Sequence, residues 1–367
     1  MTQAFSLREM EREARQRLDP AVYDYIAGGA DDEITLRANE AAFAHINLLP
    51  RVLRGAGPAH LQTAILGHRI SLPILISPTA FHRLAHPEGE CATARAAAAA
   101  GTVMIVSMAS TVAIEEVAAA SREAARGESG LWFQIYLQPD LGFTESLMRR
   151  AEAAGCSALV ITVDSPTFGG RGRDLHNGFN DLPAGMCCEN LREPMNGNDR
   201  GKARQIVFPP ELSWKNLEWL RKVTELRIVL KGIVHPEDAK LAIRHGADAV
   251  LISNHGGRQL DTVPATIDLL PAIVDAVDGK IPLLLDGGIR RGTDVVKALA
   301  LGAKAVAIGR PALWGLALAG EAGVTQVLEI LRSELDRALT LCGYSSVRDL
   351  TPDLLQLRRL EETCTHG

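Results

Sequence analysis

Eight short apolar runs, each followed by an amphipathic or Ala-rich segment, are the feature that most restricts what this chain can fold into. Each run is bounded by turn residues, as buried strands are, and the segments between them have the period of helices. Strands that alternate with helices pair in parallel through right-handed crossovers, so eight such units predict an α/β protein with a closed (β/α)8 TIM barrel. The runs are PILISPTA from Pro73, VMIVSM from Val103, LWFQIYL from Leu131, ALVITVD from Ala158, RIVLKGI from Arg227, AVLISNHG from Ala249, PLLLDGG from Pro282 and AVAIGRP from Ala305.

A doubly wound open sheet is the alternative, because it also alternates strands with helices. Its dinucleotide-binding turn, G-x-G-x-x-G after the first strand, is absent here. At 367 residues the chain is long enough for two domains, but one barrel with additional segments also accounts for this length. We therefore expect a single domain that spans residues 1–367.

Two segments lie outside the strand and helix repeat. Ser6 and Asp19-Pro20 are typical helix starts and Gly28-Gly29 is a typical stop, so residues 1–60 are predicted to form a helical prelude. The start of the fourth run, Ala158, lies 69 residues before that of the fifth, and residues 178–211 between them are rich in Asn, Asp, Arg, Pro and Gly. An insertion of this kind is most often a lid over an active site, and a disordered surface loop is the alternative.

Composition excludes several classes of protein. Hydrophobic residues make up 47% of the chain, charged residues 23%, and the net charge of -5 gives no attraction to nucleic acid. The six cysteines include no C-x-x-C pair, which favours a reducing compartment. The N-terminal stretch lacks the apolar core of a secretory signal, and the most apolar window is too short to span a membrane. We expect a cytoplasmic protein without a membrane or nucleic-acid partner.

In barrels of this kind the functional side chains follow the last apolar residue of several strands. The seventh and eighth runs are followed by DGGIRRGTD and IGRP, which place glycine amides and arginines where barrels commonly bind a phosphate. Glycine allows close approach of the backbone, and Arg290 and Arg310 have the fork geometry that suits phosphate oxygens. Two such turns in successive units predict a phosphate site, although a single one would only indicate a tight turn.

The stretch SNHGGRQLD combines an imidazole with a guanidinium on one glycine-containing loop. His255 has the intrinsic pKa of a general base, and Arg258 can bind a carboxylate through two hydrogen bonds. Lys231 ends an apolar strand, where an ammonium needs an anionic partner. That partner is a cofactor that becomes anionic or a neighbouring carboxylate with a structural role. Formation of a Schiff base with a carbonyl substrate is a further alternative for this lysine.

The chain resembles the FMN-dependent 2-hydroxy acid oxidases and dehydrogenases, which include glycolate oxidase, lactate oxidase and mandelate dehydrogenase. The resemblance covers nearly the whole chain and lies in VYDYIAGGADDEITL from Val22, SPTAFHRLAHPEGE from Ser77, FQIY, TVDSP, VLKG, SNHGGRQLD, DGGIRRGTDVVKALALGA and IGRP. It implies FMN as the cofactor, no metal, and oxidation of an (S)-2-hydroxy acid to the 2-keto acid. It further implies O2 as the electron acceptor, with H2O2 as product, and a homotetramer.

The resemblance also implies a role for each matching residue. His255 would be the catalytic base and Asp164 the carboxylate that stabilises its imidazolium, while Lys231 would stabilise the negative charge of the reduced flavin. Arg171, Arg258, Tyr25 and Tyr136 would contact the substrate. Either the hydroxyl or the α carbon would lose its proton to His255. The positions that match the flavin-binding residues are Thr79, Ala80, Ser107, Gln134, Thr162, Lys231, Ser253, Asp286, Gly288, Arg290, Gly309 and Arg310.

Some positions depart from the pattern or leave a choice open. Ala109 stands where glycolate oxidase has a tryptophan, which predicts room for a substrate bulkier than glycolate, with Phe81 and Phe168 as its apolar contacts. Arg173 is the alternative to Arg171. A quinone or cytochrome acceptor and a decarboxylating monooxygenase are the alternative activities. Because His255, Lys231 and the arginines are all present, a flavin-binding protein without catalysis is disfavoured.

Overall fold

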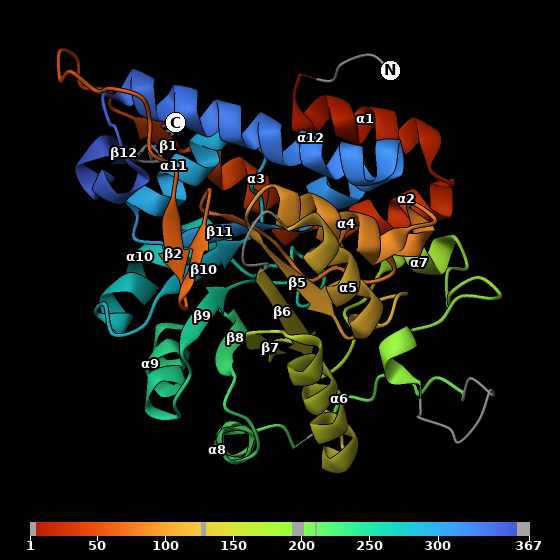
Figure 1. The fold of residues 1–367 in the computed structure, drawn as a ribbon. Coiled ribbons are helices and arrows are strands. Elements are labelled where there is room, and N and C mark those ends of the chain that lie inside the picture. The colour runs from red at the N-terminus through yellow and green to blue at the C-terminus, as the bar shows by residue number, and fades with distance from the viewer. Residues whose placement is uncertain (1–4, 126–129, 193–201, 210, 358–367) are drawn as a thin grey trace, which may run out of the picture.

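The eight apolar runs form a closed barrel of parallel strands, as the sequence predicts (Figure 1). The computed structural model describes the whole chain apart from residues 1–4, 126–129, 193–201, 210 and 358–367. Going round the barrel, neighbouring strands follow each other in chain order, and the last pairs with the first. The strands are β4 (Ile74–Ile76), β5 (Val103–Ser107), β6 (Gly130–Ile135), β7 (Ala158–Thr162), β8 (Arg227–Ile233), β9 (Ala249–Ile252), β10 (Leu283–Asp286) and β11 (Ala305–Ile308).

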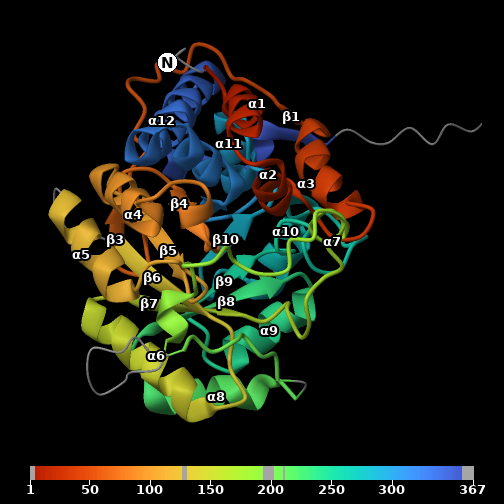
Figure 2. The same cartoon turned by 90° about the vertical axis from the view of Figure 1, so that its right-hand side faces the viewer.

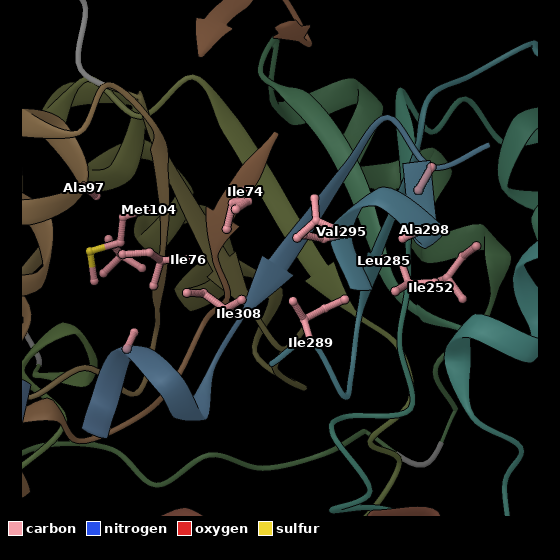
Figure 3. Packing of buried hydrophobic residues seen from close by; sticks show 14 of the residues in the cluster. Ile74, Ile76, Ala97, Met104, Ile252, Leu285, Ile289, Val295, Ala298 and Ile308 are labelled. Carbon is pink, nitrogen blue, oxygen red and sulfur yellow. The ribbon is translucent and has the colours of Figure 1, made fainter. Parts of the chain in front are cut away.

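The barrel strands read as continuous apolar runs because both of their faces are buried. In β4, Leu75 points into the barrel, whereas Ile74 and Ile76 on either side pack outward against the helices. Figure 3 shows this outer layer, in which Ile76 and Met104 of the strands lie in the same apolar cluster as residues of the surrounding helices. The two layers explain why no polar alternation marks these strands in the sequence.

The helices surround the barrel as an outer layer (Figure 2). Each barrel strand is followed by a helix, and after β7 a long insertion separates the short helix α7 from α8. The last helix bends where Ala319 and Gly320 leave helical geometry. The helices after the strands are α4 (Gly89–Ala99), α5 (Ile114–Ala124), α6 (Leu141–Ala154), α7 (Gly172–His176), α8 (Trp214–Val223), α9 (Pro236–Arg244), α10 (Thr266–Val277), α11 (Gly292–Ala300) and α12 (Arg310–Cys342).

A two-stranded hairpin that the sequence analysis did not predict closes the amino end of the barrel. It consists of β2 (Thr63–Ile65) and β3 (His68–Ile70), joined by Leu66 and Gly67, both with positive φ. Ile65 and Ile70 belong to the same apolar cluster as the inward-facing side chains of the barrel strands. The hairpin therefore covers the end of the barrel interior that is opposite to the strand ends expected to carry function.

The N-terminal segment forms three helices, α1 (Leu7–Arg17), α2 (Pro20–Ala27) and α3 (Ile34–Ala44). The predicted helix starts are confirmed, because the Ser6 side chain accepts a hydrogen bond from the N–H of Glu9 and that of Asp19 from the N–H of Ala21. Gly28 ends α2 as predicted. Figure 1 shows α1 lying along α12. After α3, β1 (Ile46–Leu48) pairs antiparallel with β12 (Leu355–Leu357), so the C-terminal end of the described chain lies beside the segment that follows the N-terminal helices.

Among the described residues, no helix combines the length and the apolar composition that crossing a membrane requires.

Candidate active site

A cavity of about 330 Å³ opens at the carboxyl ends of the barrel strands. It is lined by side chains from the strand ends, from the N-terminal helices and from the insertion after β7. All the site residues that the sequence predicts line this cavity except Asp164 and Ser253. Those two lie directly behind cavity residues, since Asp164 hydrogen-bonds to His255 and Ser253 to Lys231. The predicted residues are thus brought together in one place.

His255 is held with its Nδ1 against a carboxylate and its Nε2 toward a tyrosine hydroxyl. Nδ1 lies 2.9 Å from Asp164 Oδ1, and Nε2 lies 3.5 Å from the Tyr136 hydroxyl. His255 and the two glycines after it all have positive φ, and this run of left-handed residues turns the imidazole back over the barrel mouth. The arrangement fixes the imidazole and leaves Nε2 as the nitrogen at the cavity.

Burial favours the neutral form of the His255 imidazole, and the neighbouring charges and hydrogen bonds favour the ionised form of the Asp164 carboxylate. Burial lowers the pKa of His255, and the nearby Lys231 ammonium adds to this, although Asp164 acts in the opposite direction. Burial alone would raise the pKa of Asp164, but the neighbouring His255 and Lys231 and the hydrogen bonds from His255 and Ser165 outweigh it, so that the pKa is held at about 2. A neutral imidazole and an ionised carboxylate thus stand in contact.

Two guanidinium groups lie close to the ring of Tyr25 at the cavity that His255 also lines. The Cζ atoms of Arg258 and Arg171 lie 5.1 Å and 5.9 Å from the ring centre of Tyr25. Burial, with the like charge of Arg171, lowers the pKa of Arg258 to about 10. Arg171 has only a 3.8 Å approach to Asp174 as an ion pair, and its buried Nε has no hydrogen-bond partner. Arg258 also donates to the carbonyls of Tyr25 and Gly28, but no carboxylate pairs closely with either partly buried guanidinium among the described residues, so the two together favour an anion.

Arg173, the alternative to Arg171, lies elsewhere. Its guanidinium pairs with Glu33 at 2.6 Å and with Asp24 at 3.3 Å, and it does not line the cavity. Arg173 thus connects α7 of the insertion to the N-terminal helices. Of the two arginines, the structure places Arg171 at the cavity.

A row of polar side chains crosses the barrel mouth over successive strand ends. Ser107 Oγ donates to Gln134 Oε1 at 2.9 Å, and Gln134 Nε2 donates to Thr162 Oγ1 at 3.0 Å. Farther along, Lys231 Nζ donates to Ser253 Oγ at 3.0 Å and lies 3.8 Å from Asp286 Oδ2. The other oxygen of Asp286 is buried without a partner. Such a row offers donors and acceptors to the edge of a planar polar ring system, with a cation at one end.

The predicted phosphate site lies at the end of this row and differs in one respect from the expectation. Gly287 and Gly288 have positive φ, and Arg290 lines the cavity with its buried Nε unpartnered, while its other nitrogens donate to the Ile289 carbonyl at 3.0 Å and pair with Glu40 at 2.8 Å. The guanidinium of Arg310, by contrast, donates to main-chain carbonyls at 2.8 to 3.1 Å. The acceptors are the carbonyl oxygens of Ile26, Gly28 and Gly256.

Several cavity residues were not found by sequence analysis. The insertion contributes Asp174, Phe179, Leu182 and Ile206, and the N-terminal helix α2 contributes Ile26. None of these belongs to a strand end, and their side chains are common in loops and helices. Ser77 had a usable signal, because it ends the run PILIS, and its hydroxyl donates to Asp286 at 3.3 Å.

The residues that line the cavity fit FMN. The unpartnered atoms of Asp286 and Arg290 and the positive-φ glycines provide a polar cradle, and the row from Ser107 to Lys231 runs alongside it. The closed barrel and its charged cavity at the carboxyl ends of the strands define the protein as a (β/α)8-barrel enzyme.

The chain belongs to the FMN-dependent dehydrogenase family, whose pattern it matches over residues 14–357. It is 46% identical over 360 residues to human 2-hydroxyacid oxidase 1, covering 95% of this chain and 96% of the relative. It is 47% identical to an L-lactate oxidase from a Nostoc strain, covering 96% and 98%. A solved structure of mandelate oxidase with benzoyl-formic acid superimposes with a TM-score of 0.85 at 41% identity, covering 96% and 99%. The predictions of the family, the barrel and the cofactor are confirmed.

Proposed function

We propose that the protein oxidises an (S)-2-hydroxy acid to the 2-keto acid with FMN, and that O2 reoxidises the flavin to give H2O2. The observation that carries the proposal is the contact of His255 with Asp164 beside the buried pair Arg171 and Arg258. A 2-hydroxy acid has a carboxylate next to the carbon that is oxidised, so one substrate engages both groups. The names of the relatives, which are oxidases of 2-hydroxy acids, support the same reaction.

The protein's own residues act in this reaction by holding the substrate and by moving one proton. Arg171 and Arg258 bind the substrate carboxylate with Tyr25, which orients the α carbon toward the barrel mouth. His255 Nε2 takes a proton from the hydroxyl or from the α carbon, and Asp164 stabilises the imidazolium that results. FMN, when bound, accepts the two electrons. Lys231, a buried cation, stabilises negative charge that develops at its end of the polar row.

The substrate side chain is proposed to be larger than that of glycolate and apolar. Ala109 leaves space at the cavity wall, and Phe81, Phe168, Phe179 and Ile206 supply apolar surface around it. Such a wall offers no partner for a polar or charged substituent, which would therefore be disfavoured there. A mandelate oxidase among the structural relatives is consistent with an aromatic substituent.

We propose that residues 178–211 act as a lid within a single domain that spans the chain. Phe179 from this segment packs on the Tyr25 ring with centroids 4.9 Å apart, and Phe208 packs edge-on against Tyr136 at 5.3 Å. Residues 193–201 and 210 of the predicted lid lie outside the described residues. Both tyrosines that would contact substrate are thus in contact with the segment that would cover it.

A homotetramer and a cytoplasmic location remain proposals, as does the choice of O2 as acceptor. A quinone or cytochrome acceptor and a decarboxylating monooxygenase are the alternatives that retain the same half-reaction with the substrate.

The test is anaerobic mixing of the FMN-loaded protein with glycolate, lactate, 2-hydroxyoctanoate and mandelate, followed by admission of air. We expect the bulkier acids to bleach the flavin absorbance, with prompt recovery and formation of H2O2 in air. Bleaching without recovery would exclude O2 as the acceptor, and recovery with CO2 release would indicate the monooxygenase. If none of the acids bleaches the flavin, the proposed reaction is wrong.

A further inference from the structure

A buried glutamate that takes no part in the proposed chemistry lies beneath one wall of the cavity. Glu90 is in the first turn of α4 and is 0% exposed. Its backbone position at the start of a helix favours a negative charge. Within the described part of the chain it forms no salt bridge, and its carboxylate accepts hydrogen bonds from donors on two loops. Burying a carboxylate without an ion pair costs free energy, so its hydrogen bonds indicate what it stabilises.

Each oxygen of Glu90 accepts hydrogen bonds from the loops that follow β4 and β5. Oε1 accepts from the N–H of His82 at 3.1 Å and from the N–H of Thr111 at 2.8 Å, while Oε2 accepts from the Thr111 hydroxyl at 2.8 Å. The same hydroxyl oxygen accepts from the N–H of Arg83 at 3.1 Å. Glu90 and Thr111 together therefore hold two successive N–H groups that come directly after Phe81.

Phe81 needs this support because its backbone has a conformation that L residues with large side chains rarely adopt. Its φ is 64° and its ψ is 45°, in the left-handed region. On its other side the imidazole of His82 is fixed between Thr79 Oγ1 at 2.7 Å and Thr93 Oγ1 at 3.0 Å. The conformation presents the Phe81 ring to the cavity, where it stacks on Tyr25 with centroids 5.6 Å apart and an interplanar angle of 24°.

We propose that Glu90 is a positioning residue for substrate selection, which holds Phe81 in its left-handed conformation so that the ring forms the wall against an apolar substrate side chain. This inference rests on the proposed oxidation of 2-hydroxy acids. Thr111 lies two residues after Ala109, so the same carboxylate joins the loop that carries Phe81 to the loop that carries Ala109, and both residues line the cavity. Glu90 touches neither Nε2 of His255 nor the arginines, and it acts on the substrate only through Phe81.

The experiment compares Glu90→Ala with Glu90→Gln and Phe81→Ala, using kcat/KM for mandelate divided by kcat/KM for glycolate. Glutamine can keep its oxygen on the two N–H groups and donate from Nε2 to the Thr111 hydroxyl, so it is the matched control without the charge. We expect Glu90→Ala and Phe81→Ala each to lower the ratio about tenfold, the scale of one lost apolar contact in a substrate pocket. Glu90→Gln should stay within about twofold of wild type, on the same scale.

A double variant separates a positioning role from a general structural one. If Glu90 acts through Phe81, the double variant Glu90→Ala with Phe81→Ala should lower the ratio no further than Phe81→Ala alone. The inference would be overturned if the effects of the two substitutions multiplied in the double variant. It would also be overturned if Glu90→Ala left the ratio unchanged, including the case in which kcat/KM falls equally for both substrates. Should Glu90→Ala not fold, Thr111→Val, which removes the acceptor of the Arg83 N–H, is expected to lower the ratio in the same direction, and an unchanged ratio there would also overturn it.

Failure of the proposed reaction is distinguishable from failure of this inference. In the first case wild-type flavin is not bleached by any 2-hydroxy acid. The inference is then tested without turnover, by titrating the oxidised protein with benzoylformate and with glyoxylate and following the flavin difference spectrum. The ratio of the two dissociation constants should change about tenfold in Glu90→Ala but not in Glu90→Gln, and an equal ratio in all three proteins would refute the role of Glu90.

Discussion

The contact between His255 and Asp164 makes a prediction whose size follows from the structure. Replacing Asp164 with asparagine keeps an oxygen that accepts from His255 Nδ1, but it removes the negative charge 2.9 Å from that nitrogen. A hydrogen bond to a charged group contributes about 1.5 to 3 kcal/mol. The Coulomb energy of a unit charge pair at this separation, with an effective dielectric constant of about 20, is about 6 kcal/mol and sets the upper limit.

The charged pair exists only after the proton has moved to His255, so the loss falls on the chemical step. At about 1.4 kcal/mol for each factor of ten, Asp164→Asn should slow flavin reduction by about tenfold to about a hundredfold. The assay is anaerobic stopped-flow bleaching at saturating substrate. Ser165→Ala is the matched control, because Ser165 Oγ donates to the same Asp164 oxygen at 3.0 Å and its removal leaves the charge in place. The control should lose only a few-fold, because the Ser165 hydrogen bond is present both before and after the proton moves, so that its loss has little effect on the chemical step. A rate for Asp164→Asn within threefold of wild type would refute the reasoning.

Three further predictions follow from the same cavity. Because burial lowers the pKa of His255 below its ordinary value of 6.5, kcat/KM should stay level through neutral pH and fall only on the acid side of 6.5, as the base becomes protonated; an inflection at or above 6.5 in the pH profile would contradict this. Lys231→Met should weaken FMN binding and make the flavin midpoint potential more negative by at least about 30 mV, equivalent to about 1.4 kcal/mol for two electrons, and dye-equilibrated titration measures this. Ala109→Trp should fill the side-chain end of the cavity and lower kcat/KM for mandelate at least about tenfold more than for glycolate, the scale of a blocked substrate pocket; equal losses would mean that the substituent lies elsewhere.

The barrel could be predicted because its strands are buried on both faces. Runs such as Leu283 to Leu285 contribute to the outer layer, the barrel interior and the outer layer in turn, so every position is apolar and the run stands out. The hairpin of β2 and β3 gave no such signal. Its strands are three residues long, and Leu66, which is not a usual residue for a position with positive φ, forms half of its turn. Short strands with an atypical turn leave little periodicity to recognise.

The site could be predicted where function depends on side chains at strand ends, and not where it depends on main-chain atoms. His255 and Lys231 follow apolar runs and have residue types that are unusual there. The acceptors of the Arg310 guanidinium are carbonyl oxygens, two of them more than 280 residues away, and every residue has such an oxygen. Arg310 lines the cavity and its phosphate contact stays a prediction, but residue type could not show that three carbonyl oxygens accept from its guanidinium.

The position of Arg310 bears on how the N-terminal helices take part in the site. The last carbonyls of a helix lack partners within it and have a partial negative charge. At the end of α2, Arg258 donates to the carbonyls of Tyr25 and Gly28 at 2.6 and 3.0 Å, and Arg310 donates to those of Ile26 and Gly28. Burial lowers the pKa of Arg310 to about 9, so its desolvation is substantial and these carbonyls offset part of it.

The same two arginines therefore connect the helix that carries Tyr25 to the loop that carries His255. Arg310 also donates to the carbonyl of Gly256, and the N–H of Ala30 donates to that of Gly257 at 2.8 Å. A Cβ on Gly29 would lie 2.9 Å from the Gly257 oxygen, so the two segments of the backbone meet at a point where only glycine fits. The barrel alone presents the base, and the tyrosine reaches it only because the end of α2 is fixed to the base's own loop. Helix α2 thus contributes Tyr25 and Ile26 to the cavity and does not merely cover the barrel.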